Sequence, residues 1–114
     1  VTENTVSVPL VDDRYLPLRH GLFDRDAIVL DKMPKSLVIE SKRDSRKIRV
    51  VYEDMNYLGI WHWPKMEVNY VCIEPWSSLP SRKGIIEDLE TQPNLLHLDS
   101  GCEYRNTWSI TIEK

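Results

Sequence analysis

The sequence predicts a mostly β fold, and three observations support this prediction. In residues 47–53 the side chains of Ile48, Val50 and Tyr52 lie on one side of a predicted strand and the charged Arg49 and Glu53 on the other, as in a strand with one buried face. Residues 107–113 alternate in the same way and are rich in β-branched and aromatic side chains, which suit a pleated sheet. Helical periodicity is scarce, and seven prolines against four glycines indicate short strands joined by rigid loops.

Four shorter apolar runs are further strand candidates, and they lie at residues 27–30, 37–41, 57–61 and 69–73. Residues 42–46 (KRDSR) are polar between two apolar strands, which indicates a solvated hairpin turn rather than an anion site. Residues 81–90 are the candidate for a turn or two of helix, bounded by Pro80 and Pro93. Several strands are continuous apolar runs, which indicates that both of their faces are covered. Because a short chain has little material for this, we expect a dimer or a larger sheet assembly.

The composition indicates one core, so that residues 1–114 form a single domain or part of one. Four Trp, five Tyr and one Phe exclude intrinsic disorder. The net charge of -3 argues against a nucleic-acid partner, which requires a basic face. Neither an apolar run of membrane-spanning length nor a signal peptide is visible, so we expect no membrane partner and a cytoplasmic location.

The cysteines and histidines give weak signals for metal or redox chemistry. Cys72 lies in an apolar run and is expected to be a buried, reduced thiol, and Cys102 lies outside any C-x-x-C spacing. His20 and Asp24 have a spacing that suits metal ligands but lack a third partner. The remaining histidines are isolated, and we interpret both as surface or hydrogen-bonded groups. We therefore predict no metal site and no cofactor.

Glu74 is the most informative residue, because it is expected to end the apolar strand of residues 69–73 and precedes Pro75 and Trp76. Burying a carboxylate costs several kcal/mol unless it is paired. Glu74 is therefore either a catalytic or ligand-binding group, or a structural carboxylate bonded to backbone amides or to an arginine.

Two other features are candidate site elements. Asp26 immediately precedes an apolar strand, and the simplest interpretation is a loop aspartate that caps a turn. Trp61 and Trp63 share one strand face with Gly59, where two tryptophans more often fill a core than form a sugar-stacking platform. Motifs for nucleotide binding and for serine hydrolases are absent from the sequence.

The motifs YLGIW and YVCIEPW, together with HGLFDRDA and TWSITIE, resemble the C-terminal part of the aldose 1-epimerase (galactose mutarotase) family. The branch it is closest to is the one associated with bacterial lactose and galactose operons. The resemblance implies an all-β fold, as the C-terminal portion of a large antiparallel β-sandwich called a supersandwich. It also implies interconversion of the α and β anomers of free aldoses without cofactor or metal.

The resemblance assigns roles to four residues. Glu74 corresponds to the family's general base, which takes the proton from the anomeric hydroxyl, and Asp26 corresponds to an aspartate that hydrogen-bonds sugar hydroxyls. Trp76, by sequence, and Trp61, by strand adjacency, are then expected to form walls of the sugar pocket. The expected substrate is a monosaccharide of the aldohexose class.

The family's catalytic histidine and a substrate-binding arginine lie in an N-terminal half that this chain does not match. Ser77 and Ser78 also replace the Tyr-Gly that often follows EPW in relatives. We therefore expect the chain to work with a missing N-terminal half or with a homo-oligomer partner. The alternative is a non-catalytic carbohydrate-binding or interaction β-domain that keeps the cleft but not the reaction.

Overall fold

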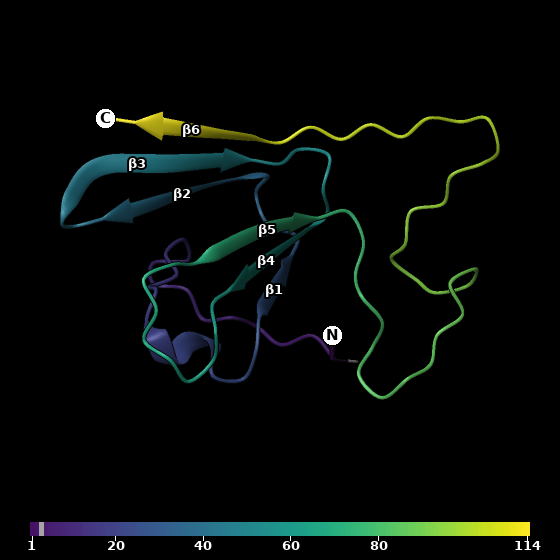
Figure 1. The fold of residues 1–114 in the computed structure, drawn as a ribbon, viewed down its shortest axis with the longest axis horizontal. Helices are drawn as coiled ribbons and strands as arrows, with labels where there is room; N and C mark the ends of the chain where they lie inside the picture. The colour runs from purple at the N-terminus through teal and green to yellow at the C-terminus, as the bar shows by residue number, and fades with distance from the viewer. Residues whose placement is uncertain (3) are drawn as a thin grey trace.

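The fold is all-β, with two three-stranded antiparallel sheets, as predicted. The computed structural model describes residues 1–2 and 4–114, and within them the single helical element is a short 3-10 turn, η1 (His20–Phe23). One sheet has the strand order β1-β4-β5 and the other has the order β2-β3-β6 (Figure 1). The strands are β1 (Ile28–Asp31), β2 (Ser36–Ser41), β3 (Asp44–Val51), β4 (Tyr57–Trp61), β5 (Cys72–Trp76) and β6 (Ser109–Glu113).

One hydrophobic cluster joins the two sheets, as in a β-sandwich. The β1-β4-β5 sheet contributes Leu30, Leu58 and Ile60, all buried, because alternate residues of β1 and β4 face the same side. From the other sheet β3 contributes Val50, which is also buried. Phe23 of η1 is fully buried in the same cluster, so the short helix closes one part of the core.

Tyr52, which follows β3, holds together two of the three connections between the sheets, the one from β1 to β2 and the one from β3 to β4. Its backbone N–H donates to the Lys35 carbonyl at 2.9 Å, and its hydroxyl donates to the Pro34 carbonyl at 2.9 Å. Lys35 Nζ in turn donates to the Met55 carbonyl at 2.7 Å. Burial raises the pKa of the Tyr52 phenol above its ordinary value. The predicted strand of residues 47–53 included Tyr52, whereas β3 ends one residue earlier, at Val51. Tyr52 is nevertheless buried, as the predicted alternation required.

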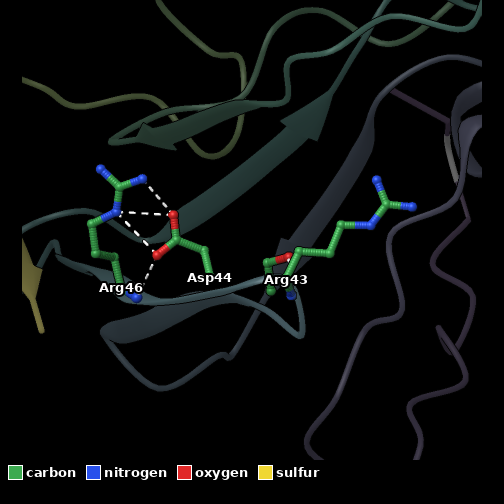
Figure 2. A network of polar contacts seen from close by, with 4 residues as sticks. Arg43, Asp44 and Arg46 are labelled. Carbon is green, nitrogen blue, oxygen red and sulfur yellow. Dashed lines mark hydrogen bonds and ion pairs between the residues drawn. The ribbon is translucent and has the colours of Figure 1, made fainter.

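The predicted hairpin turn is confirmed and is shorter than residues 42–46, because β3 already begins at Asp44. Asp44 and Arg46 form an ion pair, and the Asp44 carboxylate also accepts the Arg46 backbone N–H (Figure 2). These contacts lower the pKa of Asp44. The Arg43 side chain points away from this pair (Figure 2). The basic residues of this loop thus pair locally or extend away, as expected of a solvated turn.

Residues 77–108 form a long connection from β5 to β6 that contains neither helix nor strand (Figure 1). The helix predicted at residues 81–90 is wrong. Gly84 has a φ of 78°, which interrupts any helical turn, and Ile86 and Leu89 are largely exposed. A short helix needs a packed apolar face for stability, and these side chains have none.

The β2-β3-β6 sheet leaves part of its apolar face bare. Ile48 pairs with Ile112, and Val50 pairs with Ile110, so all four side chains point to one side. Val50 is 4% exposed, whereas Ile110 and Ile112 are 57% and 68% exposed. Val38, on the opposite face, is also exposed, so the expectation that the strands are covered on both faces is wrong for this sheet.

Candidate functional site

The candidate site lies on the face of the β1-β4-β5 sheet that points away from the hydrophobic core. Register places Glu74 directly opposite Gly59, with Tyr57 opposite Trp76 and Trp61 opposite Cys72. Directly paired residues share a face, and successive residues alternate. Because Leu58 and Ile60 point into the core, the six residues of the three pairs lie together on the other side.

Glu74 lies in the middle of β5 rather than at the end of the predicted strand, which is a correction of the expected register. The strand begins at Cys72 and includes Pro75 and Trp76. Proline is tolerated here because β5 is an edge strand, which needs backbone hydrogen bonds on one side only. On this face, Glu74 therefore stands between Cys72 and Trp76 of its own strand and opposite Gly59 of β4.

The Glu74 side chain is half-buried and lacks an ion-pair partner within the described part of the chain. The arginines that form ion pairs there are bound to other carboxylates, for example Arg49 to Glu113 and Arg82 to Glu87. The interpretation of Glu74 as a structural carboxylate paired with an arginine therefore finds no support among these residues. A half-buried, unpaired carboxylate is available to accept a proton from a ligand.

Aromatic side chains border Glu74 on the same face. The benzo ring of Trp76 covers Gly59, since a Cβ built on that glycine would lie 3.1 Å from Trp76 Cζ2. Trp61 is partly buried, and its ring centroid lies 5.9 Å from that of the exposed Trp63, edge to face. The expectation that these two tryptophans fill a core is therefore wrong. The adjacency of Trp61 to the strand of Glu74 is confirmed by the β4–β5 pairing.

Tyr57 belongs to the same face and was missed in the sequence. The spacing Tyr57, Gly59, Trp61 follows the period of a strand, which was the available signal. Sequence alone does not supply the register that places these residues beside Glu74.

Asp26 lies just before β1, in an exposed bend with a φ of 104°. Its carboxylate accepts the backbone N–H of Ala27 at 2.8 Å, and its own N–H donates to the Phe23 carbonyl. It thus has the turn-capping contacts of the simpler interpretation, and its exposed carboxylate has capacity for further hydrogen bonds. A role in sugar binding stays a prediction.

Of the two interpretations given for His62, the surface one is wrong, because the residue is 4% exposed, and the hydrogen-bonded one is correct for one ring nitrogen only. Nδ1 lies 2.8 Å from the Trp63 carbonyl, so it must be the donor, which leaves Nε2 as an acceptor in the neutral ring. Nε2 is buried and has no hydrogen-bond partner among the residues that the structure describes. The ring packs edge to face on Phe23, with centroids 4.6 Å apart, and lies near His20.

A hollow of about 300 Å³ lies beside His62, between η1 and the segment before β5. Its lining is mostly apolar and includes Leu18, Phe23 and Tyr70. None of the residues proposed to contact sugar lines it, so it is separate from the Glu74 face.

In the described residues, no cluster of three or more His, Cys, Asp or Glu side chains is arranged to hold a metal ion. Both cysteines are free thiols, and Cys72 is only partly buried, on the Glu74 face, rather than fully buried as expected. Outside the undescribed position 3, no helix has the length and apolar character to cross a membrane.

Comparison with known proteins identifies two relatives. The chain is 29% identical over 107 residues to the plasmid and the chromosomal Protein LacX of Lactococcus lactis subsp. lactis. The alignment covers 90% of this chain and 34% of each relative, so the chain spans about a third of the length of the curated relatives it matches. No protein-family model matches the chain. No solved structure matches it either. The chain is therefore a homologue of one part of the LacX proteins.

Proposed function

We propose that this chain supplies the general base of an aldose 1-epimerase, with a free aldohexose as substrate. The observation that carries the proposal is the setting of Glu74, an unpaired carboxylate in the middle of a sheet face. The large side chains around it, Tyr57, Trp61 and Trp76, are aromatic. Such rings stack on the apolar C–H faces of sugars, and an unpaired carboxylate accepts a hydroxyl proton.

In the proposed reaction, Glu74 accepts the proton of the anomeric hydroxyl. As the C1 carbonyl forms, the bond between C1 and the ring oxygen breaks, and an acid gives that oxygen a proton. Rotation about the C1–C2 bond turns the aldehyde over. The ring then closes as both protons return, which yields the other anomer. Protons and electrons balance, and no cofactor or metal is required.

None of the histidines in the described part of the chain lies on the Glu74 face to act as the acid in this reaction. His62 is buried on the core side against Phe23, His20 belongs to η1, and His97 is exposed in the long connection. We therefore place the acid in protein outside this chain, either an N-terminal half or a partner subunit. The LacX proteins are about three times as long as the part that matches, which is consistent with the first possibility.

In the same proposal, Trp76 and Trp61 form walls of the sugar site, and Asp26 hydrogen-bonds sugar hydroxyls. The missing acid favours the alternative, a non-catalytic carbohydrate-binding domain that uses the same face. The two proposals differ in one measurable quantity, the rate of anomer interconversion.

The test is Glu74→Gln in the complete protein as its gene encodes it. The amide keeps the shape of the carboxylate and still forms hydrogen bonds, so the fold and most sugar affinity should remain. Loss of a general base should slow anomerisation by about a hundredfold or more, measured by polarimetry or a coupled mutarotation assay. Glu67→Gln, at an exposed position away from the site, is the matched control and should retain the wild-type rate.

Near-normal turnover of Glu74→Gln, combined with a lower melting temperature, would show that the residue is structural. In that case the lost hydrogen bonding should cost on the order of 1 to 3 kcal/mol of stability. Sugar binding without anomerisation in the wild-type protein would favour the carbohydrate-binding alternative.

A further inference from the structure

Gly59 lies at the centre of β4, opposite Glu74, and is buried although it has no side chain. A Cβ added there would meet Trp76 Cζ2 at 3.1 Å, Trp76 Cε2 at 3.2 Å and the Glu74 Cβ at 3.4 Å. The first two distances are shorter than ordinary carbon contacts, which are about 3.5–4.0 Å. Its φ lies outside the positive region that favours glycine, so the need for glycine comes from this close approach and not from the backbone conformation.

The contact shows where the Trp76 side chain goes. Trp76 is paired with Tyr57, and Gly59 is its diagonal neighbour across the strand pair. The indole therefore leans along the sheet toward Glu74 and lies down on the backbone of β4. With any larger residue at position 59, the ring would have to stand farther from the sheet.

We propose that Gly59 is a positioning residue that sets the height of the Trp76 indole beside Glu74. A pyranose ring stacked on this indole then presents its anomeric hydroxyl to the carboxylate. The inference rests on the proposed function and deepens it, because it makes a residue without a side chain responsible for the alignment of sugar and base. The ligand class is a pyranose with an apolar C–H face.

If Gly59 were needed only for the structure, an added methyl group at this position would destabilise the fold, and the contacts indicate that it does not. The atoms that a Cβ would press against belong to the outer ring of a half-buried side chain, which can move outward by a few tenths of an ångström. The contact with the Glu74 Cβ, at 3.4 Å, lies at the short limit of ordinary van der Waals contact. The sheet should therefore survive Gly59→Ala, while the indole should be displaced from the position that suits catalysis.

The experiment compares Gly59→Ala with Gly21→Ala in the complete protein. At Gly21 an added Cβ would meet nothing closer than Asp24 Oδ2 at 3.7 Å, so this control should behave as wild type. Gly59→Ala should shift the NMR signal of the Trp76 indole N–H, assigned with Trp76→Phe. It should also lower kcat/KM for D-galactose or D-glucose anomerisation by about ten- to a hundredfold, because small misplacements of reacting groups are costly. The melting temperature should change by only a few degrees.

A double variant supplies the rescue. In Gly59→Ala with Trp76→Phe, the smaller ring leaves room for the methyl group, so the alanine should cost much less than it does beside tryptophan. If Gly59→Ala shifts the Trp76 signal yet leaves both kcat and KM at wild-type values, the proposal is overturned. An unshifted Trp76 signal overturns it as well. If Gly59→Ala does not fold, Trp76→Leu takes its place and should lose activity to the same degree, and full activity of that variant overturns the proposal.

Failure of the proposed function can be distinguished by experiment from failure of the positioning role of Gly59. If the wild-type protein binds D-galactose without anomerising it, the acid–base assignment fails, and Gly59 is then judged by affinity. Titration of the Trp76 signal with D-galactose gives the sugar affinity of each variant. The affinity of Gly59→Ala should be about tenfold lower than that of Gly21→Ala, as expected for a misplaced stacking ring. Equal affinities would overturn the positioning role by itself.

Discussion

The two sheets of the molecule are built from similar strands but differ in how well their apolar faces are covered. In the β1-β4-β5 sheet, Leu58 and Ile60 are 2% and 6% exposed, packed against η1 and the other sheet. In the β2-β3-β6 sheet, Ile110 and Ile112 have the same alternation and remain mostly exposed. Alternation in the sequence therefore predicts which face of a strand is apolar, but it does not predict whether another element packs against that face.

The covered sheet is also the one that carries the candidate site. A functional face needs a rigid support, because catalytic groups must be held close to their productive geometry. Glu74 and its aromatic neighbours stand on strands whose opposite face is fixed in the core. The apolar side of the other sheet instead leaves Ile110 and Ile112 exposed to solvent.

The largest expected effect on stability comes from comparing the same substitution, isoleucine to alanine, in each of the two sheets. Ile60→Ala in β4 should destabilise the protein by about 2–5 kcal/mol, because it leaves a cavity in the core. Ile112→Ala in β6 should change the free energy of unfolding by about 0.5 kcal/mol or less, as is usual for exposed positions. Chemical denaturation of both variants measures the difference. Equal costs would mean that the face of the β2-β3-β6 sheet is covered in solution.

The next effect concerns the junction between the sheets. Tyr52→Phe removes the hydroxyl that donates to the Pro34 carbonyl and leaves the ring in place. The lost hydrogen bond should cost about 1 kcal/mol. Tyr57→Phe, on the face away from the core, is the matched control and should cost less. A thermal melt that ranks the two variants in the opposite order would argue that Tyr52 does not hold the junction.

The sequence predicted the strands and their faces well where alternation was regular, as in residues 47–53 and 107–113. It placed Glu74 at a strand end because a following proline is usually a terminator, whereas an edge strand tolerates Pro75. The roles of Glu74 as the base and of Trp61 and Trp76 as walls of the sugar site come from the resemblance and stay predictions. The contact of Gly59 with Trp76 could not be predicted, because it depends on the register of β4 against β5, which packing between distant segments determines.

The incorrect helix prediction for residues 81–90 and the unrecognised burial of His62 have a common cause. A local apolar pattern is not sufficient for a helix unless another element covers it, and none does so there. Conversely, His62 is surrounded by Phe23 and His20, which are far from it in sequence. Both outcomes were decided by tertiary contacts that a single sequence does not display.

A smaller effect on stability, with a clear readout in solution, comes from the bare face. We expect the 114-residue chain by itself to associate as its concentration rises, because it exposes an apolar sheet face and open strand edges. Replacing Ile110 and Ile112 by threonine keeps β-branched residues in β6 and should reduce this association while changing unfolding little. Size-exclusion chromatography over a range of concentrations tests it. A compact monomer with cooperative unfolding for the unmodified chain would contradict the expectation.

The smallest effect concerns the edge of the same sheet, where Arg49 of β3 forms a charged hydrogen bond with Glu113 of β6 at 2.5 Å. This bond lowers the pKa of the Glu113 carboxyl below its ordinary value of 4.5. A carboxyl with a lowered pKa in the folded state stabilises the fold above its unfolded pKa and loses that contribution as the pH falls through the folded value. The difference in melting temperature between wild type and Glu113→Gln should therefore be greatest near neutral pH, begin to fall near pH 4.5 and disappear only when the pH is below the lowered pKa of the folded state. Because both side chains are partly exposed, the difference should be small and should shrink further in high salt. Glu103→Gln is the matched control, because the ion pair of Glu103 with Arg105 lies within one segment and joins no strands. A difference for Glu113→Gln that stays constant from neutral pH down to pH 3 would mean that β6 is held to β3 by its backbone ladder alone.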